Sequence, residues 1–519
     1  MSHRRHLLLV VIGTLLLRGT FLLANRTSLA ADPDAYRLIS RVISEHGIYG
    51  LPSTSSTTEP SPSTNFHSAV TNRDDALAPQ QPALAPVVST AYRPPLYPLI
   101  LALITPVGHG DPVNIALFHL ALGVLTSVLV WLSARDWLQG SVGRAYAATS
   151  IVVLDPLLLY QSAQVMTETL AACLTMVIVF TASRACAVAT MRWAIIVGCS
   201  LGLASLCRPT FLPLVFLLPA NFLIYRRAAD QNPQTNDSTN TNARANERAS
   251  ATVSSARDRK RILRVAMVSM LVALTVISPW VLRNRLVLGR WIATTTHGGY
   301  TLLLGNNDSF YRFLRERSPG EVWELRHPDQ MLAEARQKVN SPPDEQAPTL
   351  STPESELARE ALAYQAARIT IAEQPDSFAL ACFDRIVQFW RVLPHARSAT
   401  ESPRARAVRW SIGIWYSLVF TGALCGLFAV VRAATRRAAN LRASSPPTAS
   451  PPTASTAAEI ASSSSSSRFP WGLCLLIILV FQAAHLLYWS NPRMRAPVMP
   501  LVALLAAAAG TRLCSRDRS

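Results

Sequence analysis

Two carboxylates that lie close together, Asp32 and Asp34, have the residue types and spacing to do chemistry. They stand in the stretch Ala31-Asp32-Pro33-Asp34-Ala35-Tyr36, just after the first apolar segment of the chain. Two acids held at a membrane surface can take a proton from a hydroxyl group or bind a metal ion. The alternative is local: Asp32 caps a helix, Pro33 takes its first position and Asp34 faces the helix dipole.

The residues that follow predict the helix that must position these acids. Apolar side chains recur at i, i+3, i+4, i+7 and i+8, namely Ala35, Leu38, Ile39, Val42 and Ile43. This spacing is typical of one apolar helix face, and Gly47 is a natural stop. We expect the helix to lie flat on the bilayer, with its apolar face in the lipid and both acids at its N-terminal end.

The composition indicates a polytopic membrane protein. Half of the 519 residues are hydrophobic, and they occur in long runs separated by polar stretches. The net charge of +18 does not indicate nucleic acid binding, because the arginines lie mostly in loops beside apolar segments. Basic residues there set topology and contact lipid headgroups. The eight cysteines show no paired spacing, so neither a disulfide framework nor a zinc site is predicted.

The apolar segments predict an all-α bundle of about ten transmembrane helices. They lie at residues 7–24, 112–133, 144–160, 165–182, 192–207, 209–225, 262–282, 407–431, 470–489 and 496–512. We interpret the first as an uncleaved helix, because Arg18 interrupts it and many further segments follow. The short apolar run that ends near Val107 is expected not to cross. If it crossed, the basic loops 226–264 and 432–468 would face outward, against the positive-inside tendency.

Three parts are expected along the chain. The first is an N-terminal transmembrane module, the second an outer domain of helices, and the third a set of C-terminal transmembrane helices. The helices of the outer domain are expected near Glu354–Glu373 and from Pro375 to Phe389. The three parts span residues 1–282, 283–406 and 407–519. The first part contains the first outer loop 25–111, with a disordered Ser/Thr/Pro-rich insert at 51–91, and the basic cytoplasmic loop 226–261. The third part contains the low-complexity cytoplasmic linker 433–468.

Positive charge on the outer side runs against the insertion bias and needs a reason. The arginines concerned are Arg208, Arg283, Arg285, Arg493 and Arg495. One reason is a bound phosphate, whose oxygens match the guanidinium fork; the other is attraction to ordinary anionic headgroups. Glu168 opens a span on the same side, where it either acts beside the two aspartates or complements a helix dipole. Carboxylates beside cationic groups suit transfer of a group from a lipid phosphate to a hydroxyl.

Several short motifs, taken in order, resemble those of the GT-C glycosyltransferases. They are Asp32-x-x-x-Tyr36, Arg93-Pro94-Pro95-Leu96-Tyr97-Pro98, Glu168, Arg208-Pro209, Gly305-Asn306-Asn307 and the arginines at 493 and 495. The resemblance is to the bacterial branch similar to protein O-mannosyltransferases and the aminoarabinose transferase of lipid A. It implies a GT-C type bundle in the bacterial inner membrane, with a juxtamembrane helix, a small mainly helical periplasmic domain and an active site facing the periplasm.

The resemblance also implies a reaction. A hexosyl or pentosyl group would pass from a polyprenyl-phosphate-linked donor, with inversion, to a hydroxyl on a protein, glycolipid or polysaccharide. Asp32 fits the position of the general base, and Asp34 is the alternative. Glu168 would be the second acid, and Asp32 with Glu168 would be the ligands if a divalent metal ion takes part. The five outer arginines would hold the phosphate, and Tyr36, Arg93, Tyr97, His297 and Asn306 would contact substrate.

A transporter or flippase for a lipid-linked sugar is the competing class. It would also place cationic groups at the outer face. Such a protein should carry polar residues and broken helices near the membrane midplane, often in two repeated halves. The sequence shows no such repeat and its polar residues gather toward one face. It therefore favours the glycosyltransferase.

Overall fold

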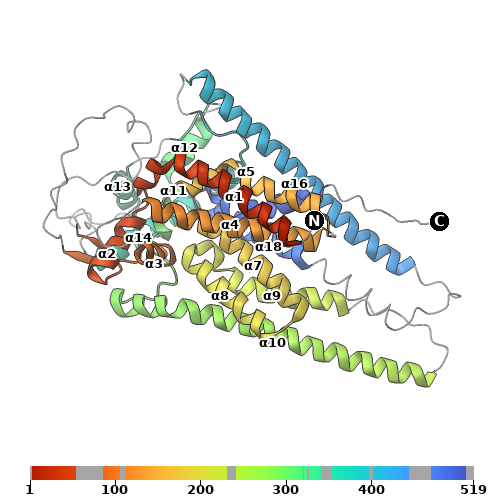
Figure 1. Ribbon diagram of the computed structural model, residues 1–519. Coiled ribbons are helices and arrows are strands. Elements are labelled where there is room, and N and C mark those ends of the chain that lie inside the picture. Colours follow the sequence, from red (N-terminus) through yellow and green to blue (C-terminus); the bar gives the residue numbers. More distant parts are fainter. Residues whose placement is uncertain are drawn as a thin grey trace.

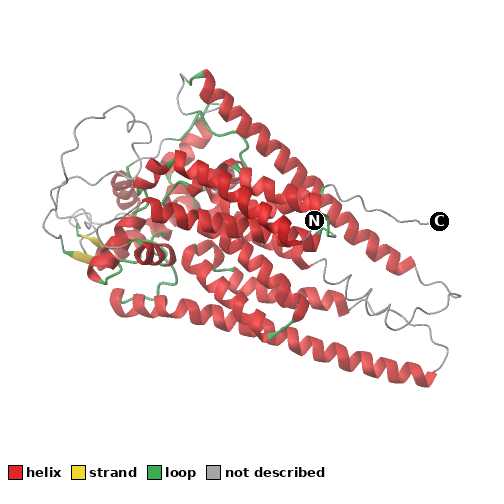
Figure 2. Ribbon diagram, in the orientation of Figure 1, coloured by secondary structure: helices red, strands yellow, loops and turns green. Residues whose placement is uncertain are grey.

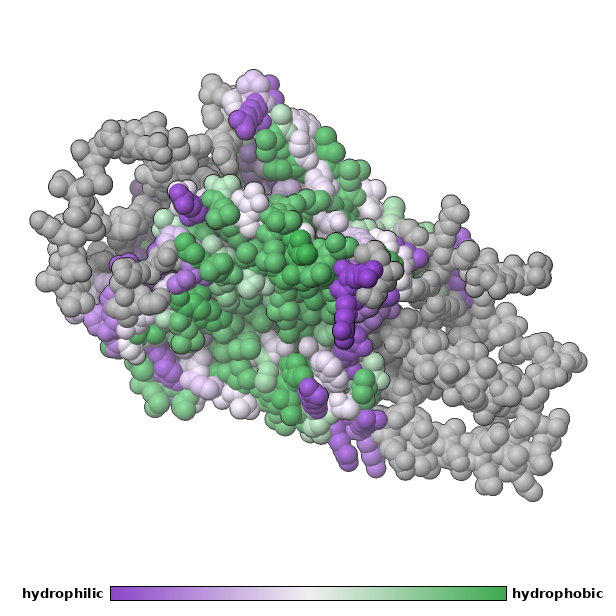
Figure 3. Space-filling view, in the orientation of Figure 1, coloured by the Kyte–Doolittle hydropathy of each residue, from purple (hydrophilic) through white to green (hydrophobic). Residues whose placement is uncertain are grey.

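The computed structural model describes residues 3–53, 86–105, 112–138, 140–230, 241–318, 321–323, 327–339, 352–396, 401–443 and 469–509. Long helices run side by side in one bundle, and shorter helices gather at one end of it (Figure 1). We call this the domain end, because it carries α2, α3 and α11 to α15. In the space-filling view apolar residues cover the middle of the bundle, and polar residues lie mainly toward its ends (Figure 3).

Six of the described helices have the length and apolarity to cross a membrane. They are α1 (His3–Ala24), α4 (Pro112–Trp137), α7 (Glu168–Val188) and α18 (Phe469–Leu487), together with Lys260–Leu288 of α10 (Thr241–Leu288) and Pro403–Ala433 of α16 (Pro403–Ala443). The pair α5 (Val142–Leu154) and α6 (Pro156–Ser162), which is bent by 50° where Asp155 precedes Pro156, is either a broken span or a re-entrant loop.

The remaining apolar segments form shorter helices. They are α8 (Met191–Cys207), the turn η2 (Pro209–Phe211) with α9 (Leu214–Asp230), and the turn η3 (Pro492–Val498) with α19 (Met499–Ala508). Every apolar segment that the sequence predicted is thus mainly helical where the structure describes it. The prediction of an all-α polytopic membrane protein is confirmed (Figure 2).

Two small residues let α8 and α10 pack at close range. A methyl group added at Gly198 would lie 2.6 Å from the Ser269 carbonyl oxygen, and one at Gly202 would lie 2.6 Å from Cβ of Val276. Small residues four apart allow helix backbones to approach in a membrane. This contact fixes the C-terminal end of α8, which carries Arg208 into the site described below.

A helix forms where predicted, α2 (Tyr36–His46), and stops at Gly47, which has φ 67°. Its apolar face is not turned wholly to lipid as expected, because Ile39 and Val42 are buried within the protein. It begins at Tyr36 rather than at Pro33, because Ala35 takes a left-handed conformation with φ 59°. The neighbouring α3 (Leu96–Ile104) has nine residues and is therefore ~14 Å long, too short to cross a bilayer. Residues 106–111 lie outside the described residues, so whether the segment that ends near Val107 spans the membrane stays a prediction.

The outer domain consists of α11 (Gly298–Gly305), α12 (Asp308–Glu316), α13 (Pro328–Val339), α14 (Pro353–Glu373) and α15 (Pro375–Phe389). The last two match the predicted helices closely. Thr352 starts α14, since its side chain accepts from the backbone N–H of Ser355 and the Ser355 hydroxyl accepts from that of Thr352. The first three helices were not predicted individually, because they are short and lack a long apolar period.

The predicted disordered insert 51–91 is ordered at both edges. Strand β1 (Gly50–Pro52) pairs antiparallel with β2 (Val87–Ser89), and Gly50 faces Ser89. The short hairpin appears in yellow at the domain end (Figure 2). Residues 54–85 lie outside the described residues.

Two of the predicted boundaries also shift. The loop 226–261 is helical at both ends, because α9 continues to Asp230 and α10 begins at Thr241. Residues 241–278 contain neither glycine nor proline and many good helix formers, so nothing in them stops the helix. Similarly, α16 continues to Ala443, inside the linker 433–468, and residues 444–468 lie outside the described residues.

Candidate active site

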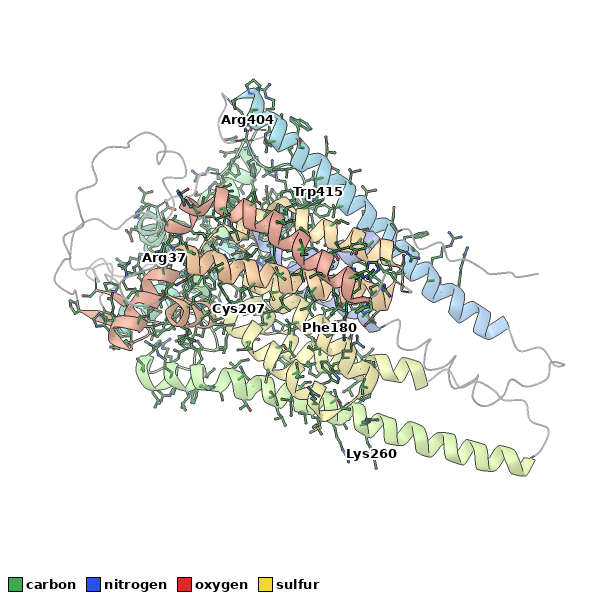
Figure 4. The ribbon with its side chains drawn as sticks, in the orientation of Figure 1. Arg37, Phe180, Cys207, Lys260, Arg404 and Trp415 are labelled. Atoms are coloured by element: carbon green, nitrogen blue, oxygen red, sulfur yellow. The ribbon has the colours of Figure 1, made fainter. Side chains whose placement is uncertain are left out.

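Five charged side chains meet at the domain end of the bundle, and we call them the charge cluster. Each comes from the end of a different element: Asp34 precedes α2, Arg93 precedes α3, Glu168 begins α7, Arg208 follows α8 and Arg493 lies in η3. Cys207, labelled inside the bundle in Figure 4, helps to align two of them. Its sulfur lies 3.9 Å from the Thr167 carbonyl oxygen, so the end of α8 adjoins the start of α7.

Arg493 joins the two acids of the cluster. Its Nη1 is 3.5 Å from Asp34 Oδ2 and its Nε is 3.1 Å from Glu168 Oε1. Each acid also has an arginine of its own: Arg93 Nη2 is 2.8 Å from Asp34 Oδ1, and Arg208 Nη1 is 3.0 Å from Glu168 Oε1. Three arginines therefore face two carboxylates, which leaves a surplus of one positive charge.

The electrostatics keep Asp34 and Arg493 ionised. Burial raises the pKa of Asp34, but attraction by Arg93 and Arg493 outweighs it, so this pKa lies below its ordinary value. Burial lowers the pKa of Arg493, but Glu168 and Asp34 outweigh that effect and hold it above the ordinary value. With a side chain 30 % exposed, Arg493 is more accessible than Arg93 at 13 % or Arg208 at 11 %.

Asp32 has a different environment from Asp34. Its Oδ2 accepts a hydrogen bond of 2.9 Å from the backbone N–H of Leu38, in the first turn of α2. Its Oδ1 is buried and has no hydrogen-bond partner among the described residues. Burial raises the pKa of Asp32, although hydrogen bonds from the first turn of the helix oppose this. One oxygen thus caps the helix, as the local alternative expected, and the other is buried without a hydrogen-bond partner.

Two predicted substrate contacts, Tyr36 and Tyr97, are buried and pack edge to face with ring centroids 5.2 Å apart. The Tyr97 hydroxyl lies 2.9 Å from Nε2 of His119, whose Nδ1 lies 2.8 Å from the Ser162 carbonyl oxygen. A carbonyl only accepts, so Nδ1 carries the proton and Nε2 accepts from Tyr97. These contacts attach α2 and α3 to the bundle. Sequence reasoning missed His119; its signal was a polar residue inside an apolar segment.

His297 and Arg93 both contact the ring of Tyr92. The His297 ring is 4.8 Å from the Tyr92 ring, and the Arg93 guanidinium lies 4.4 Å from the centre of the same ring. Burial, with the repulsion of Arg93, lowers the pKa of His297 to about 3. The imidazole is therefore neutral near pH 7 and adds no charge to the cluster. Both residues remain candidates for substrate contact.

Two of the predicted phosphate ligands hold backbone instead. Arg283 donates to the carbonyl oxygens of Thr90 at 2.8 Å and Tyr49 at 2.7 Å, which tethers the β hairpin to α10. The exposed Arg285 donates to the Gly289 carbonyl oxygen at 2.7 Å, at the end of its own helix. Neither arginine is in an ion pair with a residue of the charge cluster.

Arg495 and Asn306 also hold structure together. Arg495 is 2 % exposed, and its Nη1 donates to the carbonyl oxygens of Phe389 at 3.0 Å and Arg391 at 2.6 Å. Asn306 is fully buried and donates to backbone carbonyls of α11 and α18. Of the five arginines predicted to bind phosphate, the structure therefore brings together only Arg208 and Arg493, joined by Arg93, and phosphate binding by these three stays a prediction.

The donor set does not fit a divalent metal ion. Among the described residues there is no group of three His, Cys, Asp or Glu side chains that could hold one. Glu168 Oε1 is paired with two arginines and Asp32 Oδ2 accepts from α2, so each acid has only one oxygen without a partner, and the two arginines repel a cation from Glu168.

The fold and the cluster define a polytopic helical membrane protein with a charged site at one end of its bundle. Residues 92–234 match the family model described as dolichyl-phosphate-mannose-protein mannosyltransferase. This segment contains Arg93, Glu168 and Arg208, and over it the resemblance expected from the motifs is confirmed. No protein in the curated set matches the chain.

Solved structures of two membrane transferases show low similarity. ArnT from Cupriavidus metallidurans bound to undecaprenyl phosphate is 12 % identical, with a TM-score of 0.37 over 98 % of this chain and 78 % of that one. EmbB, an arabinosyltransferase from Mycobacterium smegmatis, is 13 % identical, with a TM-score of 0.31 over 93 % of this chain and 42 % of that one.

Proposed function

We propose that this protein is a glycosyltransferase of the bacterial inner membrane. It transfers a sugar from a polyprenyl-phosphate-linked donor to an acceptor hydroxyl at the domain end, which faces the periplasm. The observation that carries the proposal is the charge cluster, whose surplus positive charge suits a lipid phosphate. The family match of residues 92–234, which contain three members of the cluster, supports the class of reaction.

The cluster suits both the donor and the leaving group. A sugar phosphodiester carries one negative charge, equal to the surplus of the cluster, and the departing polyprenyl phosphate is more negative. Fixed arginines that meet charge as it develops stabilise the transition state more than the ground state. Arg493 is the most exposed of the three, so we assign it the first contact with the phosphate.

The geometry of an inverting displacement assigns the two aspartates different roles. The attacking hydroxyl and the leaving phosphate lie on opposite sides of the anomeric carbon, so the base must stand away from the phosphate-binding arginines. Asp34 is paired with two of them at 2.8 and 3.5 Å, so it positions arginines, as does Glu168. Asp32 has a free oxygen and a raised pKa, which fits the general base.

The reaction then balances. The acceptor oxygen forms a bond to the anomeric carbon as the bond from that carbon to the phosphate oxygen breaks. The hydroxyl proton passes to Asp32, and the bonding electron pair leaves with polyprenyl phosphate. General-base assistance of this kind contributes ~10²–10⁴ in rate.

The test traps the donor. Wild type and Asp32→Asn are purified in mild detergent, and bound lipid is identified by native mass spectrometry. We expect polyprenyl phosphate on wild type and its sugar conjugate on Asp32→Asn, because the variant binds donor without consuming it. The mass of the conjugate names the sugar. If only bulk phospholipid is found on both proteins, the proposal is wrong; if the donor crosses the bilayer without being consumed, the protein is a flippase.

A further inference from the structure

A groove lies outside the charge cluster, where the end of α10 meets α14. Its volume is about 630 Å³, and its polar and aromatic lining residues are Arg290, Trp291, Glu360, Tyr364, Gln365 and Arg368. Ligand pockets usually measure 300–1,000 Å³ and combine aromatic side chains with a few polar groups. Neither the family resemblance nor the proposed reaction assigns a role to this groove.

Trp291 gives the groove an open aromatic surface. The residue is 70 % exposed although it is large and apolar. The Arg285 guanidinium lies 5.9 Å from the centre of its ring, which orients the indole while most of it stays accessible. A flat, rigid and amphipathic side chain of this kind binds at low cost in conformational entropy.

Planar polar groups line the same groove as Trp291. Arg290 and Arg368 offer guanidinium forks, Gln365 an amide and Glu360 a carboxyl group. Burial, followed by the repulsion of Glu356, raises the pKa of Glu360 to about 7, so near neutrality its carboxyl both donates and accepts hydrogen bonds. Hydroxyl groups also do both, and a carboxyl, amide or guanidinium can bind two neighbouring hydroxyls at once.

The groove is connected to the active site through the first turns of α14. Glu356, one turn before Glu360, accepts from the Thr90 hydroxyl at 2.5 Å and from the Ala91 backbone N–H at 3.1 Å. Arg93 of the charge cluster follows two residues later. Glu360 accepts from the N–H groups of Gly298 and Gly299, which follow His297. Through α14 the groove is therefore connected to the segment that carries Arg93 and to the segment that carries His297.

We infer that this groove binds a sugar residue of the acceptor, and that the acceptor is a glycan chain. One face of the sugar ring stacks on Trp291, while its hydroxyls bind the carboxyl, amide and guanidinium groups around it. The inference rests on the proposed function, since it names the acceptor class of that reaction. A phospholipid headgroup would use the arginines but would also meet the carboxyl group of Glu360.

The test measures binding without catalysis. Protein in phosphatidylcholine nanodiscs is titrated calorimetrically with tetrasaccharides of mannose, arabinose, glucose and galactose. We expect wild type to bind at least one of them, and Trp291→Ala and Glu360→Gln to bind it about tenfold more weakly. Trp410→Ala removes another exposed tryptophan, 54 % accessible on α16, and should bind like wild type. Binding by Asp32→Asn should also be unchanged.

Three results would overturn the inference: no tetrasaccharide bound by wild type, equal binding by Trp291→Ala, or binding abolished by phosphatidylglycerol in the nanodisc. The last result would identify the groove as a headgroup site. Failure of the proposed function has a different signature, because saccharide binding would then persist while no transfer occurs. Conversely, transfer with an unchanged acceptor KM in Trp291→Ala would retain the function and reject the groove.

Discussion

Replacing Arg493 by methionine tests whether the surplus charge of the cluster binds the lipid phosphate. The variant leaves two arginines and two carboxylates in one-to-one pairs, Arg93 with Asp34 at 2.8 Å and Arg208 with Glu168 at 3.0 Å. The surplus therefore falls from one positive charge to zero. Since both acids keep a partner and the Arg493 side chain is 30 % exposed, we expect a loss of only about 1 kcal/mol in unfolding free energy.

The loss in phosphate affinity should be larger. A guanidinium and a phosphate about 4 Å apart attract by roughly 4 kcal/mol at an effective dielectric constant of 20. Desolvation and competition by water reduce this to about 1.5–3 kcal/mol net for a hydrogen bond to a charged group. At 1.4 kcal/mol per tenfold change, we expect undecaprenyl phosphate to bind about 10- to 100-fold more weakly.

The assay is a titration of undecaprenyl phosphate into nanodiscs that contain wild type, Arg493→Met or Arg285→Met. Arg285 is the matched control, because it is an arginine at the same end of the bundle whose guanidinium is held by the Gly289 carbonyl. We expect wild-type affinity in the control. If Arg493→Met binds as tightly as wild type, or if both variants lose affinity equally, the charge argument is refuted.

Three further outcomes follow from the same contacts. Asp34→Asn raises the surplus of the charge cluster to two positive charges, so the variant should bind undecaprenyl phosphate at least as tightly as wild type. It should transfer the sugar more slowly, because Arg93 and Arg493 are no longer fixed by the carboxylate. Weaker binding in the same titration would contradict the cluster model. Arg495→Met removes a buried guanidinium that donates to two carbonyl oxygens, so the free energy of unfolding should fall by about 2–4 kcal/mol. This loss should appear as a lower melting temperature in detergent, while the folded fraction keeps its phosphate affinity. His297 has a pKa of about 3 in the folded protein and an ordinary value of 6.5, so the unfolded chain takes up its proton first as the pH falls. The free energy of unfolding of wild type should therefore decline as the pH falls below about 6.5, and that of His297→Phe should decline less steeply. Urea titrations at several pH values measure both.

The helices whose apolar residues recur at regular helical spacing were predictable from the sequence. The spacing of Leu38, Ile39, Val42 and Ile43 predicted α2, and Gly47 ended it where the structure does. Charge asymmetry between loops predicted that α3 does not cross the membrane, and its nine residues are too few to do so. The helices α11 to α13 were not predicted, because short helices are stabilised by tertiary contacts more than by their own apolar pattern.

The candidate site was predictable by residue type but not by partnership. The sequence does not show which partner an arginine next to a predicted membrane span has. Arg493 is paired with a carboxylate, whereas Arg495, two residues later, donates to a backbone carbonyl. Likewise Asp32 and Asp34 are equivalent in sequence. They differ because the left-handed turn at Ala35 accompanies a helix that starts at Tyr36, where Asp32 caps it, while Asp34 meets Arg93 and Arg493.

The β hairpin has a consequence for how this protein can vary. Gly50 and Ser89 are paired, so the chain leaves the domain end and returns to it at one point. Beyond that point Arg283 and Glu356 anchor the residues leading to Arg93. Doubling the length of a loop closed in this way costs only about 0.6 kcal/mol. The segment between the strands is therefore a natural graft point, where a reporter domain or a deletion should leave the active site unchanged.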